Sequence, residues 1–424
     1  MKICHSSDWH LGHTLYGQRR YTEQTAFLDW LKQLLQQEKV ELLLVAGDIY
    51  DSSAAPLQAQ AIYYQFLAEI SAMGSCQIII IGGNHDSPGL LNAPHLLLKA
   101  LNIHVVGDGS KPEDELIVIP SNNPSVPEII VCAVPFLREQ EIRKSRPGEG
   151  SLEKEAQLQN GILQHYSQIL DAAEKLQKKL LGKYRAKSQT VRIPIITMGH
   201  LYTKGGQLRE GEGVRGLYVG SLARFDAALF ENKSDYVALG HLHIPQKVGQ
   251  NEFIRYSGSP LPMGFNEANQ SKQVMLVDFA LDNTSLKPIE VPVFQKLKRI
   301  SGDFVQILNA LQELAKGEEE LWLELLYTGD ELIPRLQELF EKEISGSALK
   351  ILRLDDQRKM KEFASYGTGV NLQELDEKAV FQRCLDAYNI PEAQQTQLFT
   401  AYEEILHQIK TEDSKLEKNA HSQD

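Results

Sequence analysis

Five short polar clusters hold most of the side chains in this sequence that could do chemistry. Each follows a run of apolar residues and combines aspartate, asparagine or histidine, mostly with a neighbouring glycine. Carboxylate, amide and imidazole groups without thiolates are typical ligands of Mn²⁺, Mg²⁺, Fe²⁺ or Zn²⁺ in hydrolytic sites. The clusters therefore predict a metal centre, and they comprise Asp8-Trp9-His10, Gly47-Asp48-Ile49-Tyr50-Asp51, Gly83-Asn84-His85-Asp86, Gly199-His200 and Gly240-His241-Leu242-His243.

The first cluster shows how neighbouring residues could share one ion. Asp8 and His10 stand two positions apart, directly after the first segment with the pattern of a strand. Residues i and i+2 of an extended chain point to the same side, so we expect both side chains to converge on one point. A pair of ions roughly 3.5 to 4 Å apart also needs a shared carboxylate, and Asp48 is the natural candidate.

Each cluster also has an ordinary structural explanation. Asp8 could be a turn or cap residue, and the aspartates of the second cluster could form Asx turns. The third cluster could cap a helix, and a single Gly-His pair could hold a packed core histidine. These separate structural roles do not explain why all five clusters occur in order, each at an expected strand end. We therefore favour one joint metal site.

The segments between the clusters predict a layered α/β fold. Up to Asp278, short β-rich runs alternate with amphipathic helices. The apolar runs 41–48 and 76–86 are typical of buried strands, and residues 56–73 and 152–181 have apolar residues at helical spacing. Sites in open α/β sheets form beyond the carboxyl ends of the strands, so distant clusters can meet in one crevice. The glycines would allow the sharp turns and close approaches that this requires.

The composition changes after Pro292, toward leucine, glutamate and lysine. We expect a helix over 303–317, a strand over 321–327, a helix over 330–344 and a strand over 348–354. These elements predict a small α+β unit without a catalytic cluster.

The predicted domains are a catalytic α/β domain over residues 1–285 and an α+β capping domain over 290–356. A linker over 357–373 leads to two short helices within 374–410, and a polar disordered tail occupies 411–424. Two short helices bury too little surface to be stable alone, so we expect a groove on another protein to receive them. Packing on the α+β domain is the alternative. The apolar stripes of the two helices are Phe381, Cys384, Leu385 and Tyr388, and Leu398, Tyr402, Ile405 and Ile409.

Composition narrows the class of protein. The chain has 424 residues, 42% of them hydrophobic, so two or three domains with substantial cores are expected. Its apolar runs are far shorter than the roughly 20 residues that span a bilayer, and its start lacks a secretory pattern. We therefore expect a cytoplasmic protein without a membrane span. The cysteines lack paired spacing, which argues against a disulfide framework and a thiolate zinc site.

The formal net charge of -12 disfavours nucleic acid as a partner, because phosphates are usually bound by lysine and arginine. Bound divalent metals, the basic stretch 178–192 or a basic partner protein would offset this charge. The charge thus weakens the case for a nucleic-acid role without excluding it.

The ordered set DWH, GDIYD, GGNHD, GH and GHLH resembles the calcineurin-type metallophosphoesterase superfamily. Within it, SSDWHLG at the start of the chain, GGNHDSP, GHLH, and YSGSP followed by GFNE resemble the bacterial DNA nuclease subunits that work with an SMC-like coiled-coil ATPase. The resemblance covers essentially the whole chain. It implies a β-sandwich flanked by helices, with the α+β capping domain and the C-terminal helices as additions.

The resemblance also implies two divalent metal ions, most simply Mn²⁺ with Mg²⁺ as the alternative. By this pattern the first ion is held by Asp8, His10 and His243, Asp48 bridges, and the second is held by Asn84, His200 and His241. His85 contacts the scissile phosphate and gives a proton to the leaving oxygen, with Asp86 orienting it. We expect Asp51 to orient a ligand or a water molecule, and we treat the remaining histidines of interest as structural, namely His13, His95, His104 and His165.

The resemblance implies a nuclease that acts on DNA ends and hairpins, as a double-strand exonuclease and a single-strand endonuclease in repair and recombination. The C-terminal helices would dock on the ATPase, and the chain would form a homodimer within a heterotetramer. A phosphomonoesterase or small-nucleotide phosphodiesterase is an alternative with the same kind of site, although a small substrate needs no extra domain. A DNA-end scaffold with a decayed site is another, although the complete ligand set disfavours it.

Overall fold

The computed structural model describes residues 1–109, 112–143, 150–203, 226–331 and 333–357, and, near the C-terminus, Phe381, Gln382, Leu385, Gln395, residues 398–400 and Tyr402. The chain divides into two compact units. The larger comprises Met1–Arg299, Glu318–Glu324 and Ala348–Arg353, and the smaller comprises Ile300–Gly317, Leu325–Ser347 and the described residues from Leu354 onward.

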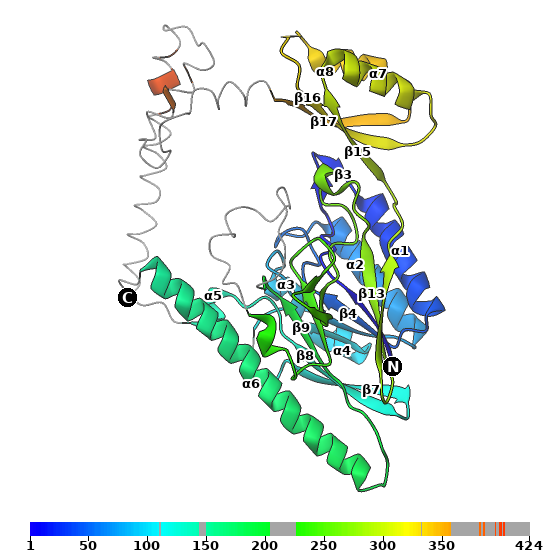
Figure 1. Cartoon of the computed structure of the whole chain (residues 1–424), viewed down its shortest axis with the longest axis vertical. Coiled ribbons are helices and arrows are strands. Elements are labelled where there is room, and N and C mark those ends of the chain that lie inside the picture. Colours follow the sequence, from blue (N-terminus) through cyan, green and yellow to red (C-terminus); the bar gives the residue numbers. More distant parts are fainter. Residues whose placement is uncertain are drawn as a thin grey trace. The chain divides into compact units, whose positions relative to one another are not determined.

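Two six-stranded sheets form the larger unit (Figure 1), in the orders β14-β13-β1-β4-β5-β6 and β11-β12-β10-β9-β8-β7. Strands β1, β4, β5 and β6 run parallel, as do β8, β9, β10 and β12, so each run has its carboxyl ends at one edge. The first sheet consists of β1 (Lys2–Ser6), β4 (Leu42–Ala46), β5 (Gln77–Ile81), β6 (Ile103–Val106), β13 (Gln273–Phe279) and β14 (Thr284–Glu290). The second consists of β7 (Leu116–Asn123), β8 (Val126–Ala133), β9 (Ile195–His200), β10 (Tyr236–Gly240), β11 (Gln246–Val248) and β12 (Asn251–Tyr256).

The two sheets pack face to face, as the residues of β4 show. Leu42 and Leu44 lie in a core that also contains Met198 of the second sheet, whereas Leu43 and Val45 lie in a core shared with helices. Successive side chains of a strand point to opposite faces, so β4 is buried on both sides, as its unbroken apolar run predicted. The expected layered α/β sandwich flanked by helices is confirmed.

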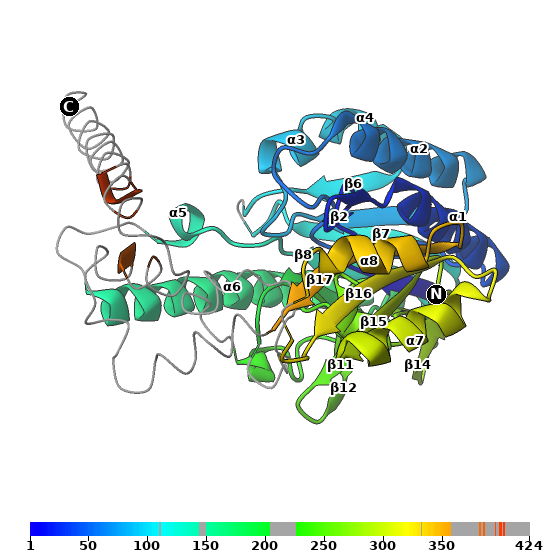
Figure 2. The same cartoon turned by 90° about the horizontal axis from the view of Figure 1, so that it is seen from above.

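Helices cover the outer face of each sheet (Figures 1 and 2). The first sheet is covered by α1 (Tyr21–Gln37), α2 (Leu57–Met73), α3 (Pro88–Asn92) and α4 (His95–Ala100), and the second by α6 (Ser151–Arg185), on which the short helix α5 (Glu139–Ile142) packs. Short elements complete this unit, namely β2 (Thr14–Leu15), β3 (Gln18–Arg19), η1 (Ala227–Leu229) and η2 (Phe265–Glu267). No helix within the described ranges is long and apolar enough to cross a membrane.

Both long helices predicted around the strands are present, and local signals explain where they end. α2 ends at Gly74, whose φ of 66° is the left-handed conformation common just after helices. α6 continues to Arg185 instead of stopping at residue 181. Lys183 and Arg185 lie in its last turn, where cations interact favourably with the helix dipole.

The smaller unit contains α7 (Phe304–Ala315) and α8 (Leu336–Glu343). Asp303 begins α7 with a capping box, and Phe304 stacks on Phe340 of α8 with ring centroids 5.5 Å apart. A three-stranded sheet, whose residues are divided between the two units, has the order β15 (Lys296–Gly302), β16 (Leu321–Tyr327) and β17 (Leu349–Asp356).

The helix expected over 330–344 is shorter than predicted, since α8 begins only at Leu336. Pro334 explains the difference, because the residue before a proline is driven out of the helical conformation. Arg335, just before the helix, has a φ of 56°. The apolar spacing of this segment therefore marked the helix but not its start.

The predicted linker and tail lie outside the described residues, apart from Gln357. In the segment 374–410, Phe381 stacks on Tyr402 with ring centroids 4.0 Å apart and also contacts Phe399. Leu385 is buried. The two predicted apolar stripes thus meet each other at Phe381 and Tyr402. The domain boundaries of the sequence analysis stay predictions.

Candidate metal centre

The polar clusters lie at the carboxyl ends of the central strands. The first three follow β1, β4 and β5, which are neighbours in the first sheet, while His200 ends β9 and His241 follows β10 in the second sheet. Contacts across the sandwich join them: the His241 N–H donates to Asp8 Oδ1 at 2.9 Å, and His200 Nε2 lies 2.9 Å from Asn84 Oδ1. The clusters therefore meet at one edge of the sandwich, where ligand sites form in such sheets.

Several residues of the centre have a strained backbone. Asp8, His10, Asp48 and His241 have φ values between 45° and 99°, a region that non-glycine residues rarely adopt. The loops after β1 and β4 are joined by hydrogen bonds from Asp8 N–H to the Gly47 carbonyl and from His10 N–H to the Asp48 carbonyl, both 3.0 Å. The expectation that Asp8 and His10 converge through an extended backbone is wrong, because β1 has already ended. They converge through this left-handed loop instead.

Two glycines allow the close approaches that the sequence predicted. Gly47 has a φ of 89°, and a Cβ atom there would lie 2.3 Å from Nδ1 of His200. A Cβ atom on Gly83 would lie 2.1 Å from Oδ1 of Asp48 and 2.3 Å from its backbone nitrogen. A side chain at either position would displace a candidate metal ligand.

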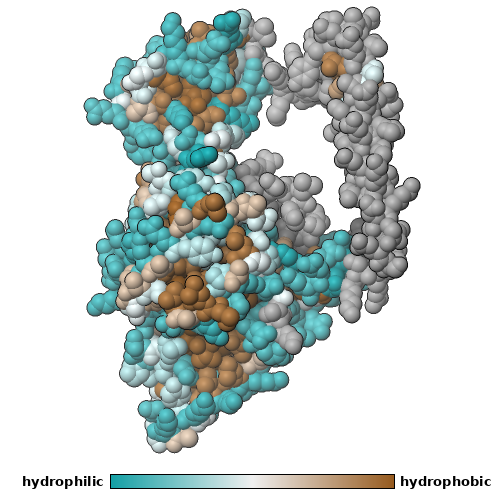
Figure 3. Space-filling view, turned by 180° about the vertical axis from the view of Figure 1, so that it is seen from behind, coloured by the Kyte–Doolittle hydropathy of each residue, from teal (hydrophilic) through white to brown (hydrophobic). Residues whose placement is uncertain are grey.

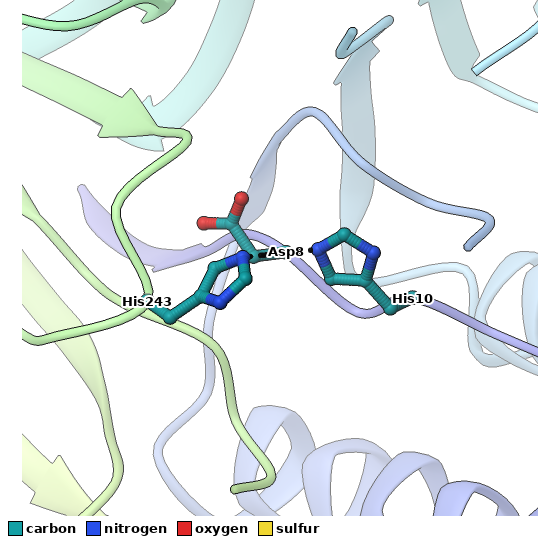
Figure 4. A group of neighbouring side chains, drawn as sticks. All are labelled: Asp8, His10 and His243. Carbon is teal, nitrogen blue, oxygen red and sulfur yellow. Dashed lines mark hydrogen bonds between the residues drawn. The ribbon is translucent and has the colours of Figure 1, made fainter. Parts of the chain in front are cut away.

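Asp8, His10 and His243 form what we call the first ligand group (Figure 4). Their side chains come from two distant loops, and their ligand atoms all lie within 4.8 Å of one another. The Nε2 atoms of His10 and His243 face each other at 3.2 Å. The Ser7 hydroxyl donates to Oδ2 of Asp8 and so fixes the carboxylate.

Asp48, Asn84, His200 and His241 form the second ligand group. Oδ1 of Asn84 lies 2.9 Å from Nε2 of His200 and 2.9 Å from Nδ1 of His241. The Nδ1–H of His200 donates to the Ala46 carbonyl at 2.8 Å, which leaves Nε2 for a ligand role. Asp48 joins the two groups, since its Oδ2 lies 3.3 Å from Nε2 of His200 and 3.7 Å from Nε2 of His10.

Burial and close charges perturb the titration of these groups. Burial and, to a smaller extent, the nearby Asp48 charge raise the pKa of Asp8 to about 6, against the opposing effect of His200. Burial would also raise the pKa of Asp48, but His200 and His10 lower it well below its usual value. Burial lowers the pKa of His200, yet Asp48 raises it more strongly, to about 9. The buried carboxylates and histidines of the centre thus shift one another's pKa strongly.

The residues present fit divalent metal ions. A separation of 3.2 Å between two Nε2 atoms matches two neighbouring ligands that each lie roughly 2.1 Å from one ion. Burial lowers the pKa of His241 to about 3 and that of His243 well below its usual value, so both offer neutral imidazole. The donor set contains no thiolate, which suits metals of the Mn²⁺ and Mg²⁺ kind.

Comparisons with known proteins agree with this centre. Residues 1–245 match the family model of the calcineurin-like phosphoesterases, and residues 293–389 match a model described as the type 5 capsule protein repressor C-terminal domain. The SbcD subunit of the nuclease SbcCD from Escherichia coli strain K12 is 33% identical over 97% of this chain and 99% of its own length. The chain belongs to the SbcD family of calcineurin-like phosphoesterases.

Another SbcD protein, that of the nuclease SbcCD from Bacillus subtilis strain 168, is 31% identical over 77% of this chain and 78% of its own length. A solved dimetal phosphatase from Danio rerio has a TM-score of 0.41 and 12% identity, over 69% of this chain and 97% of its own, and so low a score supports no conclusion. Membership of the SbcD family makes the chain a metal-dependent phosphodiesterase of the nuclease type.

His85 lies beside both ligand groups. Its ring meets the ring of His10 at 5.0 Å between centroids, and its backbone N–H donates to Oδ1 of Asp48 at 2.9 Å. The Nδ1–H of His85 donates to the Asp51 carbonyl at 2.8 Å, so its Nε2 is directed away from that bond. The ring is therefore held in one orientation by a backbone carbonyl.

The hydrogen-bond partners of Asp86 differ from those that the sequence led us to expect. We expected its carboxylate to orient His85, but it accepts hydrogen bonds from the backbone N–H groups of Ile49, Tyr50 and Gly83, at 3.1, 2.9 and 2.8 Å. The physical reason is that a buried carboxylate at this position satisfies several backbone donors at once. Asp86 therefore ties the loop after β4 to the loop that carries His85.

Asp51 lies behind the first ligand group. Its Oδ1 is 3.5 Å from Nδ1 of His10 and 3.0 Å from Nδ1 of His13. This geometry suits the orienting role expected for Asp51, and it brings His13, which we treated as structural, to the edge of the site. The i+3 spacing of His10 and His13 was the signal available in the sequence.

The structure also adds residues that the sequence analysis gave no role. Glu267, in the GFNE segment, and Lys272 are buried beside His243. The other histidines outside the motifs lie elsewhere: His165 pairs with Glu115 at 2.7 Å, and Nδ1 of His95 bonds to the carbonyl of Asn92, just before its own helix.

Proposed function

We propose that this chain is a DNA nuclease that depends on two divalent metal ions, preferably Mn²⁺. It acts as an exonuclease on double-stranded ends and as an endonuclease on single strands and hairpins, in DNA repair and recombination. The observation that carries the proposal is the meeting of two ligand groups at Oδ2 of Asp48, 3.3 Å from His200 and 3.7 Å from His10. The likeness to SbcD proteins of the nuclease SbcCD, which covers 97% of the chain in one case, supports the substrate class.

In this proposal each ligand group holds one ion. Asp8, His10 and His243 would bind the first, Asn84, His200 and His241 would bind the second, and Asp48 would be shared by the two. Such ions polarise a phosphodiester and lower the pKa of a water that attacks it. The chain contributes a buried centre, in which left-handed loops carry the ligands and a side chain at Gly47 or Gly83 would clash with them.

His85 is the proposed proton donor to the leaving oxygen. The Asp51 carbonyl binds its Nδ1–H, so the other ring nitrogen is available to carry and give up a proton. Asp86 holds the loop that carries His85 through three backbone N–H groups. A positioned donor of this kind contributes typically 10²- to 10⁴-fold to a rate.

The proposed partners are a second copy of this chain and an SbcC-type, SMC-like ATPase in the cytoplasm. The name SbcCD, which the relatives' nuclease carries, and the match of residues 293–389 to a separate C-terminal model support a dedicated docking region. The helices within 374–410 would bind the ATPase. Because Phe381 already stacks on Tyr402, the two apolar stripes would dock together.

The face formed by α2, α3 and α4 is the proposed surface for the second copy. Leu57 of α2 and Leu96 and Leu97 of α4 are 83%, 74% and 67% exposed. Figure 3 shows that apolar surface (brown) gathers on one side of the molecule. Tyr63 of α2 is buried in the core, so it would not take part. A phosphomonoesterase is the rival function. Hydrolysis of a small phosphomonoester would need neither the docking helices within 374–410 nor the exposed face of α2, α3 and α4.

One assay separates these functions. The purified chain, with and without the ATPase, is incubated with hairpin DNA, a chromogenic phosphodiester and a phosphomonoester, in Mn²⁺ and in Mg²⁺. We expect hydrolysis of the diester and cleavage of the hairpin, both greatest in Mn²⁺, and none in the matched Asp48→Asn variant. Preferred hydrolysis of the monoester, with no cleavage of DNA even in the presence of the ATPase, would contradict the proposal.

A further inference from the structure

A buried ion pair lies on the Nδ1 side of His243, opposite the nitrogen that faces His10. Glu267, the last residue of η2, is fully buried, and Lys272 is 4% exposed. Nζ of Lys272 lies 2.6 Å from Oε2 of Glu267. Neither residue belongs to the ligand groups described above.

The two carboxylate oxygens of Glu267 have different surroundings. Oε2 accepts hydrogen bonds from Lys272 and from the backbone N–H of Met263, the latter at 3.0 Å. Oε1 has no hydrogen-bond partner in the described part of the chain, and it lies 4.0 Å from Nδ1 of His243, which has none either. Buried polar atoms without partners are rare, and two that face each other need only a small movement to bond.

Lys272 also fixes the backbone of His243. Its Nζ donates to the His243 carbonyl and to Oγ of Ser259, both at 3.1 Å, in addition to Glu267. The Ser259 N–H donates to the same carbonyl at 3.1 Å. An ammonium group has three N–H donors, and each has an acceptor here. The backbone of His243 is therefore held by Lys272 and Ser259, while its ring faces Glu267.

A stabilising role alone does not account for this pair. A fully buried ion pair contributes little net stability compared with apolar residues of similar volume, because both charges lose their hydration. A carboxylate next to the outer nitrogen of a metal-binding histidine has a known physical effect: it fixes the tautomer and makes the ligand nitrogen more basic.

We propose that Glu267 is a positioning residue for His243. Its Oε1 accepts the Nδ1–H of His243, so that the lone pair of Nε2 points toward His10, and Lys272 holds the carboxylate in place. The proposal rests on the proposed function of the metal centre. Loss of such a partner typically weakens metal binding about 10- to 100-fold.

Calorimetric titration of the metal-free full chain with Mn²⁺ tests this. We expect two binding events in the unaltered chain. In Glu267→Gln, the amide oxygen faces the donors Lys272 and Met263, and the NH₂ group faces His243. Nδ1 of His243 then has a donor beside it in place of an acceptor. We therefore expect one binding event to weaken about 10- to 100-fold and the other to stay unchanged. Glu115→Gln is the matched control, since Glu115 is equally buried and also pairs with a histidine, His165. It should leave both events unchanged.

A double variant separates positioning from stability. Glu267→Leu with Lys272→Met removes both charges, so it regains thermal stability that Glu267→Gln loses by leaving a buried ammonium unpaired. Positioning predicts that the weakened binding event stays weak in this stable variant. Recovery of normal Mn²⁺ affinity together with stability would overturn the proposal, and so would equal weakening of both events in Glu267→Gln.

A second readout needs no metal. The ¹⁵N shifts of the His243 ring should indicate Nδ1–H in the unaltered metal-free chain and a shift toward Nε2–H in Glu267→Gln. An unchanged tautomer would contradict positioning. Failure of the unaltered chain to bind Mn²⁺ would instead contradict the proposed function, so the two failures are distinguishable.

Discussion

The two ligand groups are supported in different ways. In the first, the outer nitrogen of each histidine faces a carboxylate: Asp51 lies 3.5 Å behind His10, and Glu267 lies 4.0 Å behind His243. In the second, Nδ1 of His200 donates to a neutral carbonyl, that of Ala46. Extra negative charge behind a histidine makes it a stronger ligand. The comparison indicates that both histidines of the first group are supported by side chains, whereas His200 of the second is supported by the backbone.

The two groups resemble each other in the pKa shifts of their histidines. Burial lowers the pKa of His10, but Asp51 and Asp48 raise it more, so it ends above its usual value, as does that of His200. The pKa values of His243 and His241 lie below their usual value instead, because burial lowers each of them. Each group thus pairs one histidine whose pKa is raised with one whose pKa is lowered.

Removal of the shared ligand should have the largest effect. Asp48→Ala takes away the carboxylate that faces both groups, so we expect loss of hydrolysis and of tight binding of both ions. The fold should persist, since Asp48 lies beyond the end of β4. Titration with Mn²⁺ measures this, with circular dichroism as the control for folding. Two normal binding events in the variant would contradict the bridging role.

His85→Ala should separate proton transfer from metal binding. We expect turnover to fall roughly 10²- to 10⁴-fold while both binding events persist, because His85 is a proposed donor and not a ligand. The defect should shrink with substrates whose leaving group is a weak base, since these need the proton less. Equal defects for good and poor leaving groups would show that proton donation is the wrong role.

The pH dependence of metal binding should reveal the raised pKa of His200, about 9 in the metal-free chain. Below that pH the ring is protonated, and an ion must displace the proton, so affinity of the second group rises roughly tenfold per pH unit toward pH 9. Calorimetry at pH 7 in two buffers of different ionisation enthalpy counts the protons released. Binding without proton release would contradict the shift.

A truncation far from both groups in the sequence should affect neither. A chain that ends after Gly369 lacks the proposed docking helices, so we expect unchanged hydrolysis of a small phosphodiester and loss of co-purification with the ATPase. A matched variant, Phe381→Ala, should weaken the complex less. Complex formation at full strength by the truncated chain would show that the helices serve another surface.

The sequence predicted the chemistry of the centre better than its geometry. Runs such as 41–48 identified strands whose ends carry Asp48, because the apolar pattern and the polar cluster are both local in the chain. The convergence of Asp8 and His10 was predicted for the wrong reason, since left-handed φ values leave no periodic trace. The start of α8 was missed because apolar spacing continued through Pro334.

Residues that act through tertiary contacts were the hardest to find. Glu267 and Lys272 contact His243 only once η2 and β13 have packed beside the loop after β10. The spacing of these residues in the sequence does not predict the contact. Asp51 was easier, since it stands three residues from Asp48. The candidate ligand residues can thus be predicted from local sequence patterns, whereas the residues that position them become visible only in the folded structure.

The claim that two ions share Asp48 can be tested most directly by diffraction. A crystal of the chain grown with Mn²⁺ and measured near the manganese absorption edge gives an anomalous peak for each bound ion. We predict two peaks roughly 3.5 to 4 Å apart, one beside each ligand group and both in contact with Asp48. A single peak, or two peaks of which only one contacts Asp48, would contradict the account.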